Sequence, residues 1–178
     1  MRNIVLRNLL RGPQTEPPPS AGGEALKQLA AAVNQAAMRR LGRSLSIREV
    51  DAGSCNGCEL EVHALNNPVY DLERLGFKFV ASPRHADVLL VTGPVTQNMK
   101  VALERAHAAT PDPKWIVALG DCACTGGLFK GSYACAGAVE SVLPVDLHIP
   151  GCPPRPAEIL QGLIALMDAA SRTKSARR

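Results

Sequence analysis

The sequence has few aromatic residues, no apolar run long enough to cross a membrane and no phosphate-binding loop motif. Aromatic side chains make up 3% of the 178 residues. This argues against a nucleic-acid partner, because single-strand binders need rings on which bases stack. No apolar run approaches the roughly 20 residues of a membrane-spanning helix. Neither G-x-x-x-x-G-K-[ST] nor G-x-G-x-x-G occurs, so no nucleotide site of either kind is predicted.

The rest of the composition is typical of a globular protein in a reducing compartment. The hydrophobic fraction is 46%, and with so few aromatics the core must be built from Val, Ile, Leu and Ala. The opening MRNIVLRNLLRG is too short and too interrupted by arginine for a secretory signal. Six cysteines without such a signal are expected to bind metal or stay free, not to form disulfides.

Three regions are expected along the chain. Residues 1–43 are predicted to form an extension: a basic amphipathic segment at 1–12, a proline-rich linker, and an amphipathic helix at 24–41 that ends at a glycine. The segment at 1–12 is interpreted either as a docking segment for a partner or membrane surface, or as a frayed terminus. Residues 44–170 are predicted to form the α/β domain, and residues 171–178 a basic tail.

Within residues 44–170, short apolar runs alternate with helical patterns. Strands are expected at 45–50, 77–81, 87–92, 114–119 and 146–149, and helices at 58–66, 69–75, 97–109 and 156–170. Thr96 is expected to cap the helix at 97–109, and Pro156 suits the first turn of the last helix. This alternation predicts a parallel sheet covered by helices on both faces.

Four cysteines each lie just after an apolar run: Cys55, Cys58, Cys122 and Cys152. In an open parallel sheet the loops that follow the carboxyl ends of the strands share one edge, where ligands bind. The four thiols are therefore expected to meet there and hold a metal centre. An iron–sulfur cluster and a structural zinc ion both accept four thiolates. One C-x-x-C pair with two distant single cysteines favours the cluster, since structural zinc normally uses two close pairs.

The two remaining cysteines, Cys124 and Cys135, are expected to be small buried hydrophobic residues.

The motifs GSCNGCELEV, SPRHADVLLVTGPVTQNM, GDCACTGG and IPGCPPRPAEILQGLIAL, in this order, resemble the small iron–sulfur subunit shared by complex I and [NiFe] hydrogenases. The likeness is greatest to the small subunit of membrane-bound, energy-converting hydrogenases of the formate hydrogenlyase type. It covers about residues 44–168. The resemblance implies a flavodoxin-like α/β fold, here with a helical amino-terminal extension, and one [4Fe–4S] cluster held by Cys55, Cys58, Cys122 and Cys152.

The resemblance also implies a role and partners. The chain would relay electrons between a hydrogenase-like large subunit and ferredoxin-like iron–sulfur subunits, as a peripheral part of a membrane complex on the cytoplasmic face of the inner membrane. Bond chemistry would belong to the large subunit. Glu61, and less closely Glu59, would match an acidic residue suspected in proton transfer or potential tuning. Arg84 and the loop Thr92-Gly93-Pro94 are expected at the cluster-facing edge.

Two other functions stay open from the sequence. One is a complex I-like subunit that feeds electrons to a quinone. The C-x-x-C spacing weighs against it, because complex I subunits have two adjacent cysteines there. The other is a zinc-stabilised structural subunit with no redox role.

Overall fold

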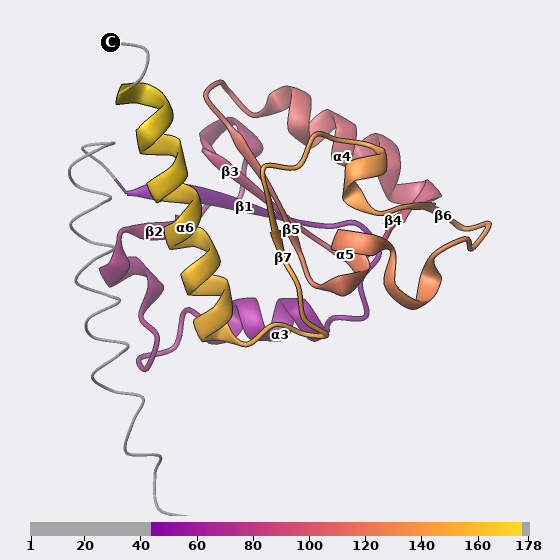
Figure 1. The fold of residues 1–178 in the computed structure, drawn as a ribbon, viewed down its shortest axis with the longest axis horizontal. Helices are drawn as coiled ribbons and strands as arrows, with labels where there is room; N and C mark the ends of the chain where they lie inside the picture. The colour runs from indigo at the N-terminus through magenta and orange to yellow at the C-terminus, as the bar shows by residue number, and fades with distance from the viewer. Residues whose placement is uncertain (1–43, 176–178) are drawn as a thin grey trace, which may run out of the picture.

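The centre of the molecule is a five-stranded parallel sheet. The computed structural model describes residues 44–175, so the predicted extension at 1–43 lies outside the described residues. The strand order is β2-β1-β3-β5-β7 (Figure 1). The strands are β1 (Leu45–Asp51), β2 (Phe77–Phe79), β3 (Val88–Thr92), β5 (Trp115–Leu119) and β7 (Leu147–Ile149). This order is that of flavodoxin-like sheets, which confirms the predicted fold class.

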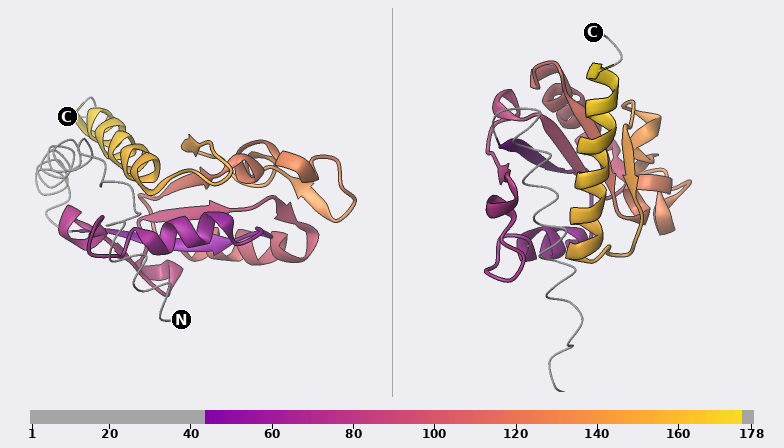
Figure 2. Two further views of the ribbon diagram at one scale, coloured as in Figure 1. Left: turned by 90° about the horizontal axis from the view of Figure 1, so that it is seen from below. Right: turned by 60° about the vertical axis from the view of Figure 1, so that its left-hand side comes forward.

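Helices cover both faces of this sheet. They are α3 (Gly57–Ala64), α4 (Gln97–Ala109), α5 (Asp121–Thr125) and α6 (Pro156–Ser175). Buried residues of α3 and α6 share one core cluster with the sheet, and buried residues of α4 and α5 share a second cluster on the other face. Figure 2 shows α6, in yellow, running beside the sheet. Each helix thus buries an apolar side that would be exposed without the sheet.

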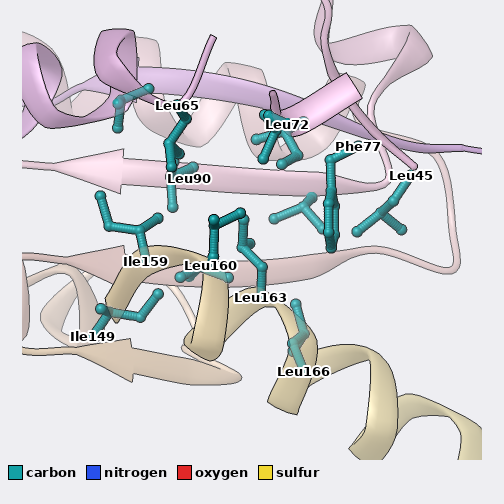
Figure 3. Packing of buried hydrophobic residues seen from close by; sticks show 14 of the residues in the cluster. Leu45, Leu65, Leu72, Phe77, Leu90, Ile149, Ile159, Leu160, Leu163 and Leu166 are labelled. Carbon is teal, nitrogen blue, oxygen red and sulfur yellow. The ribbon is translucent and has the colours of Figure 1, made fainter. Parts of the chain in front are cut away.

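The strands build both clusters by simple alternation. Val88 and Leu90 of β3 point into the cluster beneath α3 and α6, whereas Leu89 and Val91 point into the other. All four are fully buried, as expected of a strand between two helical layers. Figure 3 shows the first cluster, in which Leu160 and Leu163 of α6 face the sheet.

Several predicted elements differ in detail. The helix expected at 69–75 is a short 3-10 helix, η1 (Leu72–Leu75). The last helix starts at Pro156 as expected but continues to Ser175, into the predicted tail. α5 and an antiparallel pair, β4 (Val95–Thr96) with β6 (Cys135–Gly137), were not predicted. These elements have at most five residues, too few for a periodic pattern to develop.

Thr96 stands at the expected cap position of α4 but makes no side-chain capping bond. Its hydroxyl donates instead to the backbone oxygen of Ala52 (3.0 Å), and its N–H donates to the same oxygen (2.9 Å). Thr96 therefore fastens β4 to the loop that follows β1. Among the described residues, no helix is long and apolar enough to cross a membrane.

Aspartates fasten neighbouring strands at the amino edge of the sheet. Asp87 N–H donates to the Ser46 oxygen (2.8 Å), and Asp87 Oδ2 accepts the Ser46 N–H (2.9 Å). Asp146 makes the same pair of bonds with Ile116, at 2.8 and 2.7 Å. Asp87 is buried and Asp146 is exposed, so the two form a matched pair for measuring what this exchange contributes.

We expect Asp87→Ala to lower the free energy of unfolding by about 1–3 kcal/mol, because it leaves a buried N–H without an acceptor. Asp146→Ala should cost less, since water can replace an exposed carboxylate. Chemical denaturation of the two variants measures the difference. Equal losses would mean that burial of Asp87 adds nothing to this bond.

Candidate metal centre

The four predicted cysteines follow the carboxyl ends of three parallel strands. Cys55 lies in the loop after β1, and Cys58 lies in the first turn of α3. Cys122 lies in α5, directly after β5, and Cys152 follows β7. Cys58 and Cys122 are half-buried, whereas Cys55 and Cys152 are exposed. The topology therefore brings all four to the same edge of the sheet.

The thiols are close enough to act on one another electrostatically. Burial, then the charge on Glu59, then the charges on the other three cysteines raise the pKa of the Cys58 thiol to about 12. The pKa of the Cys122 thiol is raised by burial first and then by Cys152 and Cys55. A cation at this point would relieve the repulsion among these thiolates, which is the usual electrostatic effect of a bound metal.

Glycines leave room for the two half-buried sulfurs. A Cβ added to Gly120 would lie 2.6 Å from the Sγ of Cys58, and one added to Gly127 would lie 2.7 Å from the Sγ of Cys122. Both glycines have positive φ, +87° and +51°. Only glycine meets both demands, because a side chain would collide with a sulfur and strain the backbone. The residues present therefore fit a sulfur-bound metal group.

Hydrogen bonds hold the loops that carry Cys122 and Cys152 together. Asp121 N–H donates to the Gly151 oxygen (2.8 Å), and Asp121 Oδ1 accepts the Gly151 N–H (2.8 Å). This is the reciprocal exchange seen at the amino edge, here between residues next to Cys122 and Cys152. It fixes these two cysteines relative to each other without using their side chains.

The loop after β1 is ordered by Asp51. Its Oδ1 accepts N–H groups from Gly53 (2.8 Å) and Ser54 (2.7 Å). The predicted loop at 92–94 also lies at this edge, because a Cβ on Gly93 would stand 2.4 Å from the Ser54 nitrogen. The approach to Cys55 is thus set by backbone contacts between two adjacent loops.

Within residues 44–167, no three His, Cys, Asp or Glu side chains are grouped to hold a single metal ion. Zinc with four sulfurs at about 2.3 Å needs a tight tetrahedron. An iron–sulfur cluster is larger and takes its four thiolates at its corners. Thiols that act on one another without closing on one ion fit the larger group better.

The other two cysteines lie apart from this arrangement in the fold. Cys124 packs against the core cluster beneath α4 and donates to the Ala118 oxygen (3.5 Å). Burial raises the pKa of its thiol to about 11. Cys135 lies in β6, paired with Thr96. Both positions suit the structural role predicted for them.

Of the two glutamates after Cys58, Glu59 lies against the site. Its charge raises the pKa of Cys58, and both of its carboxylate oxygens are buried without a hydrogen-bond partner. Glu61 is half-buried further along α3. A third carboxylate, Glu49 of β1, was not singled out from the sequence. Its pKa is raised by burial and next by Glu59. The available signal was a glutamate at an inward position of a buried strand, following Leu45 and Ile47.

The expectation for Arg84 was wrong. Arg84 lies in η2 (Pro83–His85), before β3, and lines a recess with Ser46 and Pro111. Ser46 belongs to the start of β1, so this recess is at the amino edge, opposite the cysteines. The sequence motif placed Arg84 close to β3 but did not show at which end of the strand it would lie.

Known proteins resemble this chain over the region that holds the four cysteines. Residues 55–166 match the family described as NADH ubiquinone oxidoreductase, 20 Kd subunit. Formate hydrogenlyase subunit 7 of Escherichia coli is 45% identical over 132 residues, which are 74% of this chain and 52% of that protein. The chain thus spans about half the length of that relative.

Two further relatives come from membrane complexes. The probable membrane-bound hydrogenase subunit mbhJ of Pyrococcus furiosus is 44% identical over 132 residues, covering 74% of this chain and 79% of that protein. A chain in the structure of an archaeal membrane-bound sulfane sulfur reductase superposes with a TM-score of 0.62 and 35% identity. That match covers 71% of this chain and 70% of the other.

We expect Gly120→Ala to remove most of the metal bound per chain, because the added methyl group occupies the place of the Cys58 sulfur. The matched control is Gly131→Ala. Gly131 has a similar φ of +83° but nothing within 4 Å of its Cβ position, so it suffers the same backbone strain, about 1–2 kcal/mol, without the collision. Metal analysis of the purified variants tests this. Full metal content in Gly120→Ala would show that Cys58 is not a ligand.

Proposed function

Because the chain belongs to the NADH ubiquinone oxidoreductase 20 Kd subunit family, we propose that it is an electron-transfer subunit that binds one [4Fe–4S] cluster through Cys55, Cys58, Cys122 and Cys152. Family membership confirms the resemblance found in the motifs. The observation that carries the proposal is the mutual electrostatic effect of these four thiols across three loops.

When bound, such a cluster takes up and releases single electrons. The chain's own residues bury one side of the site, fix the four sulfurs and set the surrounding charge. Gly120 and Gly127 allow backbone to approach the sulfurs closely, and Glu59 adds negative charge beside Cys58. Negative charge near a cluster disfavours an added electron, so Glu59 is expected to lower the reduction potential. Glu61 is kept as a second candidate for this tuning or for proton transfer.

We place the chain in a hydrogenase-like complex and not in a quinone-reducing one. The relatives at 45% and 44% identity are named as subunits of formate hydrogenlyase and of a membrane-bound hydrogenase. The C-x-x-C spacing of Cys55 and Cys58 supports the same choice. Hydrogen evolution or uptake by the intact complex, measured beside quinone reduction, distinguishes the two.

The proposed partners are a hydrogenase-like large subunit, ferredoxin-like iron–sulfur subunits and membrane subunits of one complex, with the chain peripheral on the cytoplasmic face of the inner membrane. Residues 1–43 are proposed as an extension that docks on this complex, followed by the cluster domain at 44–170 and a basic tail at 171–178.

Exposed apolar side chains follow the ligand cysteines and suit a contact with the large subunit. Leu60 is two residues beyond Cys58 and 61% exposed. Leu128 and Tyr133 lie in the segment after Cys122 and are 96% and 98% exposed. Apolar side chains exposed in this way commonly mark protein interfaces. We propose that the large subunit covers these residues, and with them the exposed side of the cluster.

The ligand assignment is tested by Cys152→Ser, with Cys135→Ser as the matched control. We expect Cys152→Ser to lower the iron content and to weaken or alter the EPR signal of the reduced, anaerobically purified chain, because serine is a poor substitute for a thiolate. Cys135→Ser should leave both near the wild-type values. Equal losses would contradict the assignment, and a colourless wild-type protein with stoichiometric zinc would contradict the cluster.

The proposed interface is tested by the double variant Leu128→Asp and Tyr133→Asp. Two carboxylates at an apolar contact should reduce the amount of large subunit that copurifies by at least tenfold, since burying charge without a partner is costly. Val69→Asp is the control, because Val69 is also exposed (67%) but lies beyond the far end of α3. Undiminished copurification of the double variant would place the interface elsewhere.

A further inference from the structure

Three side chains have buried oxygens without a hydrogen-bond partner in the described part of the chain. They are Glu49 (Oε1), Glu59 (both carboxylate oxygens) and Thr92 (Oγ1). Such atoms are uncommon in native proteins, since each has lost its contacts with water and gained nothing in return. Thr92 is the most demanding of the three, because it is fully buried at 0% exposure.

The sheet register places two of these side chains next to each other. Glu49 continues the alternation of Leu45 and Ile47, and Thr92 continues that of Val88 and Leu90. All of these residues lie on the face that α3 and α6 cover. Glu49 pairs with Leu90 and Asp51 pairs with Thr92, so Thr92 is the diagonal neighbour of Glu49 on this face.

The third side chain comes from the helix above this face. Glu59 lies in the first turn of α3, and its charge acts directly on Glu49. Its two oxygens have no contact with solvent, so they are enclosed between α3 and the sheet. The three orphaned groups therefore come from β1, β3 and α3 at the layer between helix and sheet.

The hydrogen-bonding capacities of these groups indicate the missing partner. The orphaned atoms are three carboxylate oxygens, which accept, and one hydroxyl, which can donate once. Two acceptors are left over. A water molecule donates two hydrogen bonds and also accepts, so one water completes the set. Buried waters typically make about three hydrogen bonds to polar groups that would otherwise be unsatisfied.

We propose that Glu49, Glu59 and Thr92 bind an internal water molecule between β1, β3 and α3. A metal ion is a poorer occupant, because only two carboxylates are present and no third His, Cys, Asp or Glu in the described residues completes a single-ion group. The water would tie the first turn of α3 to the sheet and hold the Glu59 carboxylate in place. This inference is independent of the proposed cluster, because none of the three side chains is a proposed ligand.

The test variant is Thr92→Val, which keeps the shape of the side chain and removes only the hydroxyl. If the hydroxyl binds water, its loss should lower the melting temperature of the full-length chain and remove the water density from a high-resolution structure of the assembled complex. If no water is present, removing an unsatisfied buried hydroxyl should leave the melting temperature unchanged or raise it. The sign of the shift therefore decides between the two.

Two further variants calibrate the result. Thr110→Val removes the hydroxyl of another buried threonine, whose Oγ1 donates to the Ala106 oxygen at 2.8 Å, so it sets the shift expected from losing one satisfied bond. Thr92→Ser retains the hydroxyl and should retain the water density. The proposal stands if Thr92→Val falls as Thr110→Val does and wild type and Thr92→Ser show the water. It is overturned if wild type shows no density there, or if Thr92→Val is at least as stable as wild type.

Discussion

The parallel pairing of β1, β3, β5 and β7 is the constraint on which the site depends. Parallel strands end at a common edge, so loops that are far apart in the sequence become neighbours there. In this chain, the segments that follow β1, β5 and β7 each begin with glycine or aspartate and lead directly to a cysteine. A shift of one residue in the register of any of these strands would move its cysteine away from the others and exchange its two faces.

The edge is stiffened mainly by backbone contacts. Asp121 and Gly151 exchange hydrogen bonds in the way that Asp87 and Ser46 do at the opposite edge. This exchange extends strand pairing by one step past the last residue of each strand, so that Cys122 and Cys152 follow from a fixed frame. The side chains of the cysteines are left free for ligation, and the cost of ordering the loops is met before any metal arrives.

The sequence was sufficient for the large features of the molecule. The five strands, α4, the start of α6 and the convergence of four cysteine-bearing loops all follow from strong patterns: apolar runs, helical spacing and cysteines at strand ends. The position of Arg84 was missed because a motif lies near a strand without indicating which end. The hydroxyl of Thr96 was assigned to a cap because the sequence could not show that the Ala52 oxygen lies within its reach. The role of Glu49 depends on α3, whose placement against β1 no local pattern encodes.

The unequal exposure of the cysteines has a consequence for the order of assembly. Cys55 and Cys152 face outward, whereas Cys58 and Cys122 are half-buried against glycines. An inorganic core can enter only from the open side, and a subunit docked over that side would close the entrance. Maturation of the centre should therefore precede docking, so that the partner recognises a loaded chain.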